Sequence, residues 1–203
     1  MDASLPNMPG YGLNEYMLVL TPHEELRKKI QQIKGEFSKE YKCPQALWGK
    51  PHSLLVRFSQ FEMMEERIVN RLKTVAMGFH PIRVEAKNFG SYPSHSIFIQ
   101  IVSREPIREL IQEIRLTQRI LKVDNEHKPY FTDDAHILIS NNLLPWQYEA
   151  GWQEFSQCQF TGRFIAESML LLKRRSGEKQ WQILQRLEFQ NLPVANRQGE
   201  LFG

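Results

Sequence analysis

The sequence predicts an α+β fold of two similar lobes around a central cleft. The chain passes twice through the same order of elements: a helix, a strand led by a histidine, a helix and a hairpin. The two leading histidines, His52 and His136, lie 136 − 52 = 84 positions apart, and each precedes a short apolar run. In such a fold two equivalent strands can lie side by side and bring their histidines together.

The composition is that of a globular protein. Of the 203 residues, 41% are hydrophobic and 24% are charged, and a chain of this length can bury a full core, so we expect one bilobal domain over residues 1–203. The formal net charge of +3 is too small to predict binding of duplex DNA. It is compatible with a localised anionic ligand.

Cysteine usage and the chain ends predict a soluble, cytoplasmic protein. Cys43 and Cys158 cannot form a disulfide framework for a chain of this size, which favours a reducing compartment. The start of the chain lacks the pattern of a signal peptide, so residues 1–13 are expected to be a flexible lead-in and residues 190–203 a loose tail. The longest apolar run, 169–172, is far shorter than the ~20 residues that span a bilayer, so no membrane partner is expected.

The first elements are a strand and a helix. A run of strand formers closed by Thr21 and Pro22 predicts a buried strand over 15–20. Apolar residues at spacings of three and four predict a helix over 23–40, namely Leu26, Ile30, Ile33 and Phe37. Its lysines are expected mostly on the solvent face: Lys28, Lys29, Lys34 and Lys39.

The rest of the first half leads through the first histidine strand to a hairpin. Residues 43–50 are expected to form a loop, and Pro51 favours an extended start to the strand at 52–58. Helical periodicity follows over 62–77, before Gly78. The remaining runs, 82–89 and 96–102, are expected to pair as strands through the turn-rich link at 90–93.

The second half repeats this order. An apolar stripe predicts a helix over 105–122, followed by a polar connection to the strand that begins at His136. Pro145 suits the first turn of a helix over 145–157, and Trp146 and Trp152 are expected to anchor that helix to the sheet. The runs 164–173 and 181–189 flank Ser176-Gly177-Glu178 and predict a final hairpin.

The two histidines suit acid–base chemistry. In cleavage of a phosphodiester, a neutral imidazole can take a proton from the attacking group while a charged one gives a proton to the leaving group. The sequence offers no metal-ligand cluster such as Cys-x-x-Cys, no G-x-S-x-G elbow and no phosphate-binding Gly-rich loop. No cofactor or metal is therefore expected.

The two histidine strands, their spacing and the order of elements resemble the two-histidine phosphoesterase superfamily, which includes the bacterial 2′-5′ RNA ligase and cyclic phosphodiesterase families. The resemblance covers about residues 14–190. It implies two lobes of antiparallel sheet with outer helices, and two His-x-Thr/Ser motifs that face each other across a groove. It further implies metal-independent action on 2′,3′-cyclic or 2′-5′ phosphodiesters of nucleotides or RNA ends, with His52 and His136 as the catalytic pair.

The chain departs from this pattern at the third motif position, where Leu54 and Leu138 replace the hydroxyl residues. Alternation along a strand places each leucine on the same face as its histidine and turns Ser53 to the opposite face. Loss of one donor to a developing oxyanion costs about 2.7–4 kcal/mol in other enzymes. The alternative function is therefore a non-catalytic module that binds a nucleotide, an RNA end or a less polar ligand in a leucine-lined cleft.

Other side chains have weaker signals. Tyr92, Tyr130 and Phe131 lie near the ends of cleft strands, where a ring could stack on a base, although core packing or loop anchoring is the favoured explanation. Asp133 and Asp134 could orient His136 or belong to a turn. Arg57 is not expected to bind a phosphate, because alternation turns it away from His52. Structural roles are expected for the remaining histidines: His23, His80, His95 and His127.

Overall fold

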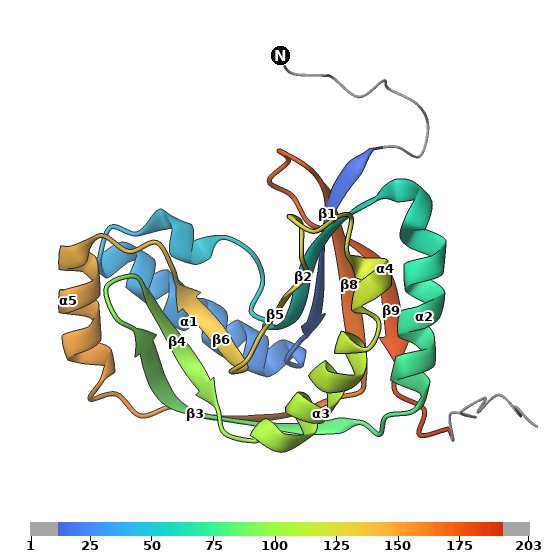
Figure 1. Cartoon of the computed structure of the whole chain (residues 1–203). Helices are drawn as coiled ribbons and strands as arrows, with labels where there is room; N and C mark the ends of the chain where they lie inside the picture. The colour runs from blue at the N-terminus through green and yellow to red at the C-terminus, as the bar shows by residue number, and fades with distance from the viewer. Residues whose placement is uncertain (1–11, 193–203) are drawn as a thin grey trace, which may run out of the picture.

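The computed structural model describes residues 12–192, which form a curled antiparallel sheet with helices on both sides (Figure 1). The nine strands are β1 (Leu13–Leu20), β2 (Ser53–Phe61), β3 (Ile82–Tyr92), β4 (Ser96–Ile101), β5 (Tyr130–Phe131), β6 (His136–Ser140), β7 (Thr161–Ala166), β8 (Ser168–Arg175) and β9 (Gln182–Glu188). Their order is β7-β3-β4-β6-β2-β1-β8-β9, and the short β5 pairs with β2. The predicted α+β class is confirmed.

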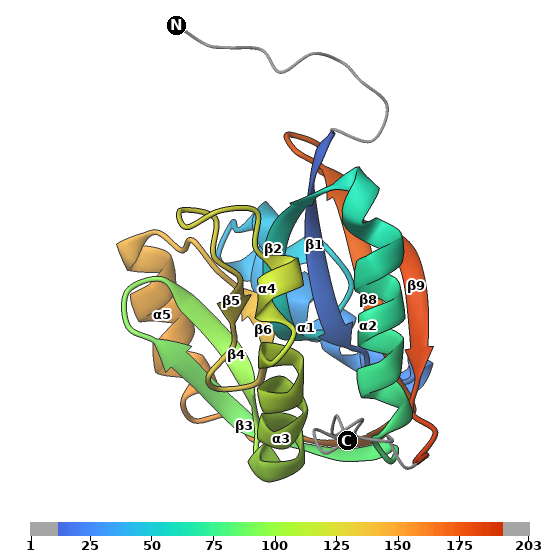
Figure 2. The same cartoon turned by 45° about the vertical axis from the view of Figure 1, so that its right-hand side comes forward.

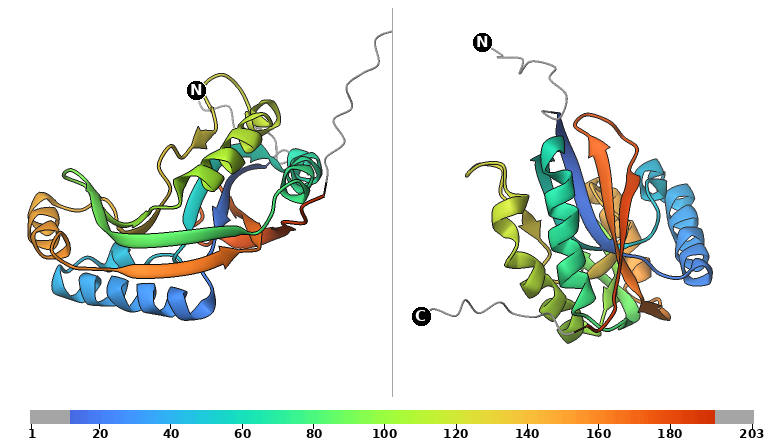
Figure 3. Two further views of the ribbon diagram at one scale, coloured as in Figure 1. Left: turned by 90° about the horizontal axis from the view of Figure 1, so that it is seen from below. Right: turned by 90° about the vertical axis from the view of Figure 1, so that its right-hand side faces the viewer.

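The helices are α1 (Glu24–Glu40), α2 (Glu65–Met77), α3 (Arg104–Arg115), α4 (Gln118–Leu121) and α5 (Pro145–Phe155), with 3-10 turns η1 (Pro44–Leu47) and η2 (Glu62–Met64). α1 follows β1 in the chain but packs against β6 and β7, while α5 packs against β4. α2 contacts β9 and α4 contacts β2 (Figure 2). Figure 3 shows α1 on one side of the curled sheet and α2 and α3 on the other. The strands from β7 to β6 are thus contacted by α1 and α5, and the strands from β2 to β9 by α4 and α2.

The apolar residues of the sheet and helices form one buried cluster. β1 is buried along most of its length and pairs with β2 along one edge and with β8 along the other. In α1 the predicted apolar spacing holds, and the ring of Phe37 packs edge-on against Phe155 of α5. This cluster fixes the positions of β2 and β6 in the middle of the sheet.

Two predicted elements are wrong. The strand predicted over 164–173 is two strands: β7 pairs with β3 at one edge of the sheet, and β8 pairs with β1 and β9 on the far side. The helix predicted over 105–122 ends at Arg115 and restarts as α4. Between them the hydroxyl of buried Thr117 donates to the carbonyl of Ile114 at 2.6 Å and competes with the helical hydrogen bonds.

Smaller corrections concern the hairpin turn, one lysine and one tryptophan. β3 continues to Tyr92, so the turn to β4 is residues 93–95 and overlaps the predicted link only at Pro93. Lys34 is buried rather than on the solvent face, because it lies on the same stripe of α1 as the apolar residues. Trp152 packs against the core as predicted, whereas Trp146 is half exposed and does not belong to the residues packed against the core.

The predicted lead-in and tail lie mostly outside the described residues. At their edges, Leu13 already belongs to β1, and the backbone amides of Asn191 and Leu192 donate to Phe79 and Met77. In the described part of the chain, no helix has the length and apolar character needed to cross a membrane.

Candidate active site

The two histidine strands are direct neighbours in the sheet. β2 and β6 run antiparallel, and Ser53 pairs with Ile137. His52 and His136 are the residues before these two, so each lies one position from the same cross-strand pair. Continuing the register makes them a diagonal pair on one face, with Cα atoms ~7–8 Å apart. The electrostatic influence of His136 on the pKa of His52 agrees with this proximity.

Both rings are held in the same way. Nδ1 of His52 bonds the carbonyl of Lys50 at 2.8 Å, and Nδ1 of His136 bonds the carbonyl of Asp134, also at 2.8 Å. A carbonyl can only accept a hydrogen bond, so Nδ1 carries the hydrogen in both rings. Nε2 of each histidine is then the nitrogen left to exchange a proton with a ligand.

Burial makes both imidazoles weaker bases than usual. It lowers the pKa of His52, and the positive charges of Lys34 and His136 lower it further, against the carbonyl hydrogen bond, which raises it. Burial also lowers the pKa of His136, while the carbonyl and the carboxylate of Asp134 oppose that shift. At neutral pH both rings are therefore neutral, and an anion bound between them would favour protonation of one.

An aromatic wall stands beside His136. The His136 ring lies 4.5 Å from the Phe98 ring and 5.5 Å from the Tyr92 ring, centroid to centroid. Gly90 makes room for this packing, because a Cβ at that position would lie 2.6 Å from Cε2 of Phe98. Burial raises the pKa of Tyr92, so its phenol stays protonated and can donate a hydrogen bond. The predicted ligand contact Tyr92 thus lies next to a predicted catalytic residue.

The two motif leucines share the histidine face. Cross-strand register places Leu54 opposite His136 and Leu138 opposite His52, and both leucines are half-buried. Ser53 is turned the other way and fully buried, as alternation predicts, and its hydroxyl has no hydrogen-bond partner within residues 12–192. The hydroxyl of Ser140 is also buried and lies 3.1 Å from the sulfur of Cys43. Neither serine supplies the missing motif hydroxyl.

Phe131 and Tyr130 occupy the short strand β5. Phe131 pairs with Val56, packs against the core, and lies with its ring 4.9 Å from the Arg115 guanidinium. These contacts match the core-packing alternative for Phe131. Tyr130 is 62% exposed and remains open to a stacking partner.

The two aspartates before His136 hold the connection in place. Asp133 pairs with Arg115 at 3.6 Å, and the carboxylate of Asp134 pairs with Arg104 of α3 at 3.5 Å. The backbone carbonyl of Asp134, rather than its side chain, orients the His136 ring. Arg57, which was not expected to bind a phosphate, is exposed and pairs with Glu15.

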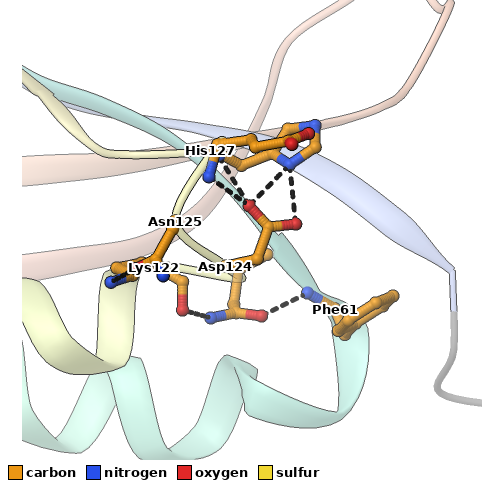
Figure 4. A network of polar contacts seen from close by, with 7 residues as sticks. Phe61, Lys122, Asp124, Asn125 and His127 are labelled. Carbon is orange, nitrogen blue, oxygen red and sulfur yellow. Dashed lines mark hydrogen bonds and ion pairs between the residues drawn. The ribbon is translucent and has the colours of Figure 1, made fainter.

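The remaining histidines have local roles. His127 closes the loop of residues 122–127, where its ring nitrogen and backbone amide both meet the carboxylate of Asp124 (Figure 4). His95 repeats the ring-to-carbonyl bond of the candidate pair, 3.0 Å to Pro93, and its ring stacks on Tyr92. It is exposed, however, so this bond alone does not mark a catalytic histidine.

Lys34 is the site residue that the sequence analysis missed. It is 4% exposed, and its charge is close enough to His52 to lower the pKa of that ring. The spacing of the apolar residues already indicated that Lys34 is buried, since Lys34 follows Ile30 by four and precedes Phe37 by three on the apolar stripe of α1. A lysine at such a position is buried whenever the stripe packs.

Comparison of the chain with protein-family models gives no match, and comparison with curated proteins gives no significant one. The structure itself defines the class as a mixed α+β protein with a curled antiparallel sheet. Among residues 12–192, no three His, Cys, Asp or Glu side chains are grouped so that they could hold a metal ion. The site is therefore interpreted from its own residues.

Proposed function

We propose that the protein is a metal-independent phosphoesterase that acts on 2′,3′-cyclic or 2′-5′ phosphodiesters of nucleotides or RNA ends. The observation that carries this proposal is the diagonal placement of His52 and His136 on one face of adjacent strands, each with Nδ1 bound to a carbonyl. The Nε2 atom of each ring is thereby left for proton exchange, and proton transfer at both ends of a phosphodiester requires two such groups.

For a 2′,3′-cyclic phosphate, one histidine removes a proton from water as the water oxygen bonds to phosphorus. The bond from phosphorus to one ribose oxygen breaks, and the second, protonated histidine gives its proton to that oxygen. The products are a phosphomonoester and a free ribose hydroxyl. The first histidine ends protonated and the second neutral, and exchange with solvent restores both.

The test is turnover of a panel of 2′,3′-cyclic nucleotides and 2′-5′ dinucleotides by wild type, His52→Ala and His136→Ala, with a chelator present throughout. Each substitution is expected to lower kcat about 100- to 10,000-fold, the range for loss of a general acid or base. His95→Ala is the matched control, because His95 makes the same ring-to-carbonyl bond outside the pair. Absence of turnover by the wild type above background would overturn the proposal for these substrates.

A second function is favoured by the leucines. Leu54 and Leu138 are half-buried on the histidine face and offer no donor to a phosphate. A binding module would hold a nucleotide, an RNA end or a less polar ligand there without cleaving it. Calorimetric titration with the same panel separates the two, because binding that His52→Ala weakens, without any turnover, would establish the module and exclude the enzyme.

A further inference from the structure

The surroundings of the two histidines differ in charge. Lys34 of α1 is buried, and its Nζ donates two long hydrogen bonds, to the carbonyl of Trp48 at 3.5 Å and to that of Gly49 at 3.4 Å. The next carbonyl in the same loop, that of Lys50, holds the ring of His52. One short segment therefore fixes both the amine and the imidazole. Among residues 12–192, Lys34 forms no ion pair with a carboxylate.

Burying a cation without a counter-ion lowers the stability of the fold, because two distant carbonyls do not replace the hydration that the cation loses. Burial lowers the pKa of Lys34 to about 8, so the amine is still mostly protonated at neutral pH. The fold thus keeps a positive charge near His52 at the expense of stability. Such a cost is typical of residues retained for function.

The group near His136 has the opposite charge to the group near His52. The carboxylate of Asp134, two residues before it, is close enough to favour the charged imidazole. Arg104 of α3 pairs with that carboxylate at 3.5 Å and offsets part of its charge. On the ring side of His136 stand Tyr92, whose phenol is neutral, and His95 beyond it. Around His52 the charged or titratable groups are Lys34, His136 and the exposed ammonium of Lys50.

We propose that Lys34 and Asp134 divide the two catalytic roles: His52 is the base that takes the proton from water, and His136 is the acid that gives a proton to the leaving ribose oxygen. This inference rests on the proposed function and adds the direction of proton flow. Lys34 acts through His52 and is a positioning residue. The cation disfavours protonation of His52 and the carboxylate favours protonation of His136, so the ring that a bound anion protonates is His136.

The pH profile of kcat/KM tests this division. Activity requires neutral His52 and protonated His136, so His52 sets the acid limb and His136 sets the alkaline limb. Lys34→Gln should move the acid limb to higher pH, by the order of one unit. Asp134→Asn should move the alkaline limb to lower pH, and Arg104→Gln should move it to higher pH. Lys34→Arg, which keeps the charge, should restore the acid limb.

The controls separate charge from structure. Lys39→Gln removes an exposed lysine of the same helix and should move neither limb. A purely structural role for Lys34 would lower activity at all pH values without displacing a limb. Displacement of the alkaline limb by Lys34→Gln, or of the acid limb by Asp134→Asn, would overturn the assignment.

A second measurement does not depend on turnover. NMR titration of the two imidazoles, assigned with His52→Gln and His136→Gln, should give His52 a lower pKa than His136 in the wild type, and Lys34→Gln should raise only that of His52. The reverse order would overturn the division of roles even in an active enzyme. The predicted order in a protein without turnover would overturn the proposed function while keeping the electrostatic arrangement.

Discussion

The face that carries His52 and His136 and the loop of residues 122–127 hold histidines in contrasting ways. In the loop, the ring of His127 meets the carboxylate of Asp124 at 2.9 Å, and both side chains are about half exposed (Figure 4). On the histidine face, both rings are largely withdrawn from solvent and bond only backbone carbonyls. A histidine–carboxylate pair is the more familiar sign of catalysis, yet here it closes a turn.

The two regions differ in whether the fold favours the charged forms of their titratable groups. In the loop, hydrogen bonds from the backbone amide and ring of His127 lower the pKa of Asp124, so the charged carboxylate is favoured in place. On the histidine face, burial disfavours the charged forms of His52, His136 and Lys34. The comparison teaches that buried, poorly compensated groups mark the candidate site better than a short hydrogen bond does.

Apart from substitution of the histidines themselves, the largest expected effect comes from restoring a motif hydroxyl. Leu54→Thr or Leu138→Thr places a donor on the histidine face, and each should raise kcat on a responsive substrate by about 100-fold, the scale of one oxyanion donor. Leu54→Val and Leu138→Val are matched controls, because valine has the shape of threonine without the hydroxyl. Equal rates for the threonine and valine variants would show that the developing charge does not lie between these strands.

The next effect concerns the cost of Lys34. Its pKa falls from the ordinary 10.5 to about 8, so between these values the unfolded chain binds more protons than the folded one, and stability rises with pH. Below pH 8 the full penalty is present, about 3 kcal/mol. Lys34→Met should therefore raise the free energy of unfolding by up to that amount at pH 7, and the gain should vanish near pH 10.5.

Urea unfolding of wild type and Lys34→Met at pH 7, 9 and 10.5 measures this difference. Lys39→Met, at an exposed position of the same helix, should show no such pH dependence. A destabilised Lys34→Met at pH 7 would mean that the hydrogen bonds to the loop outweigh the burial of charge. This measurement sharpens the comparison, since a costly cation is what distinguishes the histidine face from the loop.

Part of this arrangement followed from sequence patterns. Strand formers, helical spacing and the leading histidines predicted β2, β6 and α1 to within a few residues, because each depends on local periodicity. The split between β7 and β8 was missed, although the buried positions change phase there, from Phe164 and Ala166 to Met169 and Leu171. Such a phase change can be recognised only once both partner strands are known.

The site was predictable to a similar degree. Alternation placed the leucines beside the histidines, but it could not show that the carbonyl of Asp134, rather than its carboxylate, holds His136. Nor could it place Tyr92 against that ring, or Lys34 near His52, because both contacts join segments distant in sequence. Long-range packing decides these contacts.

A smaller effect tests the packing of Phe98 and Tyr92 beside His136. Gly90→Ala would put a methyl group 2.6 Å from Phe98 and 3.0 Å from Gln100, so we expect a loss of about 1–3 kcal/mol in the free energy of unfolding and a displaced His136 ring. Gly35→Ala is the opposite case, because no atom lies within 4 Å of its Cβ position in α1. That variant should gain about 0.5–1 kcal/mol from helix propensity. Thermal unfolding of both variants checks the prediction, and equal stabilities would contradict it.

The smallest effect is expected in the loop. The backbone amide of His127 is the main cause of the lowered pKa of Asp124, ahead of the ring, and His127→Ala keeps that amide. The pKa of Asp124 should therefore stay below its ordinary value of 3.8, as measured by NMR titration of the carboxyl group. Asp124 should still contribute stability above that value and lose it as the pH falls through its folded pKa.

Turnover of His127→Ala should equal that of the wild type. A loss approaching that of His52→Ala would transfer the catalytic assignment to the loop, because the exposed histidine–carboxylate pair would then be the working acid or base.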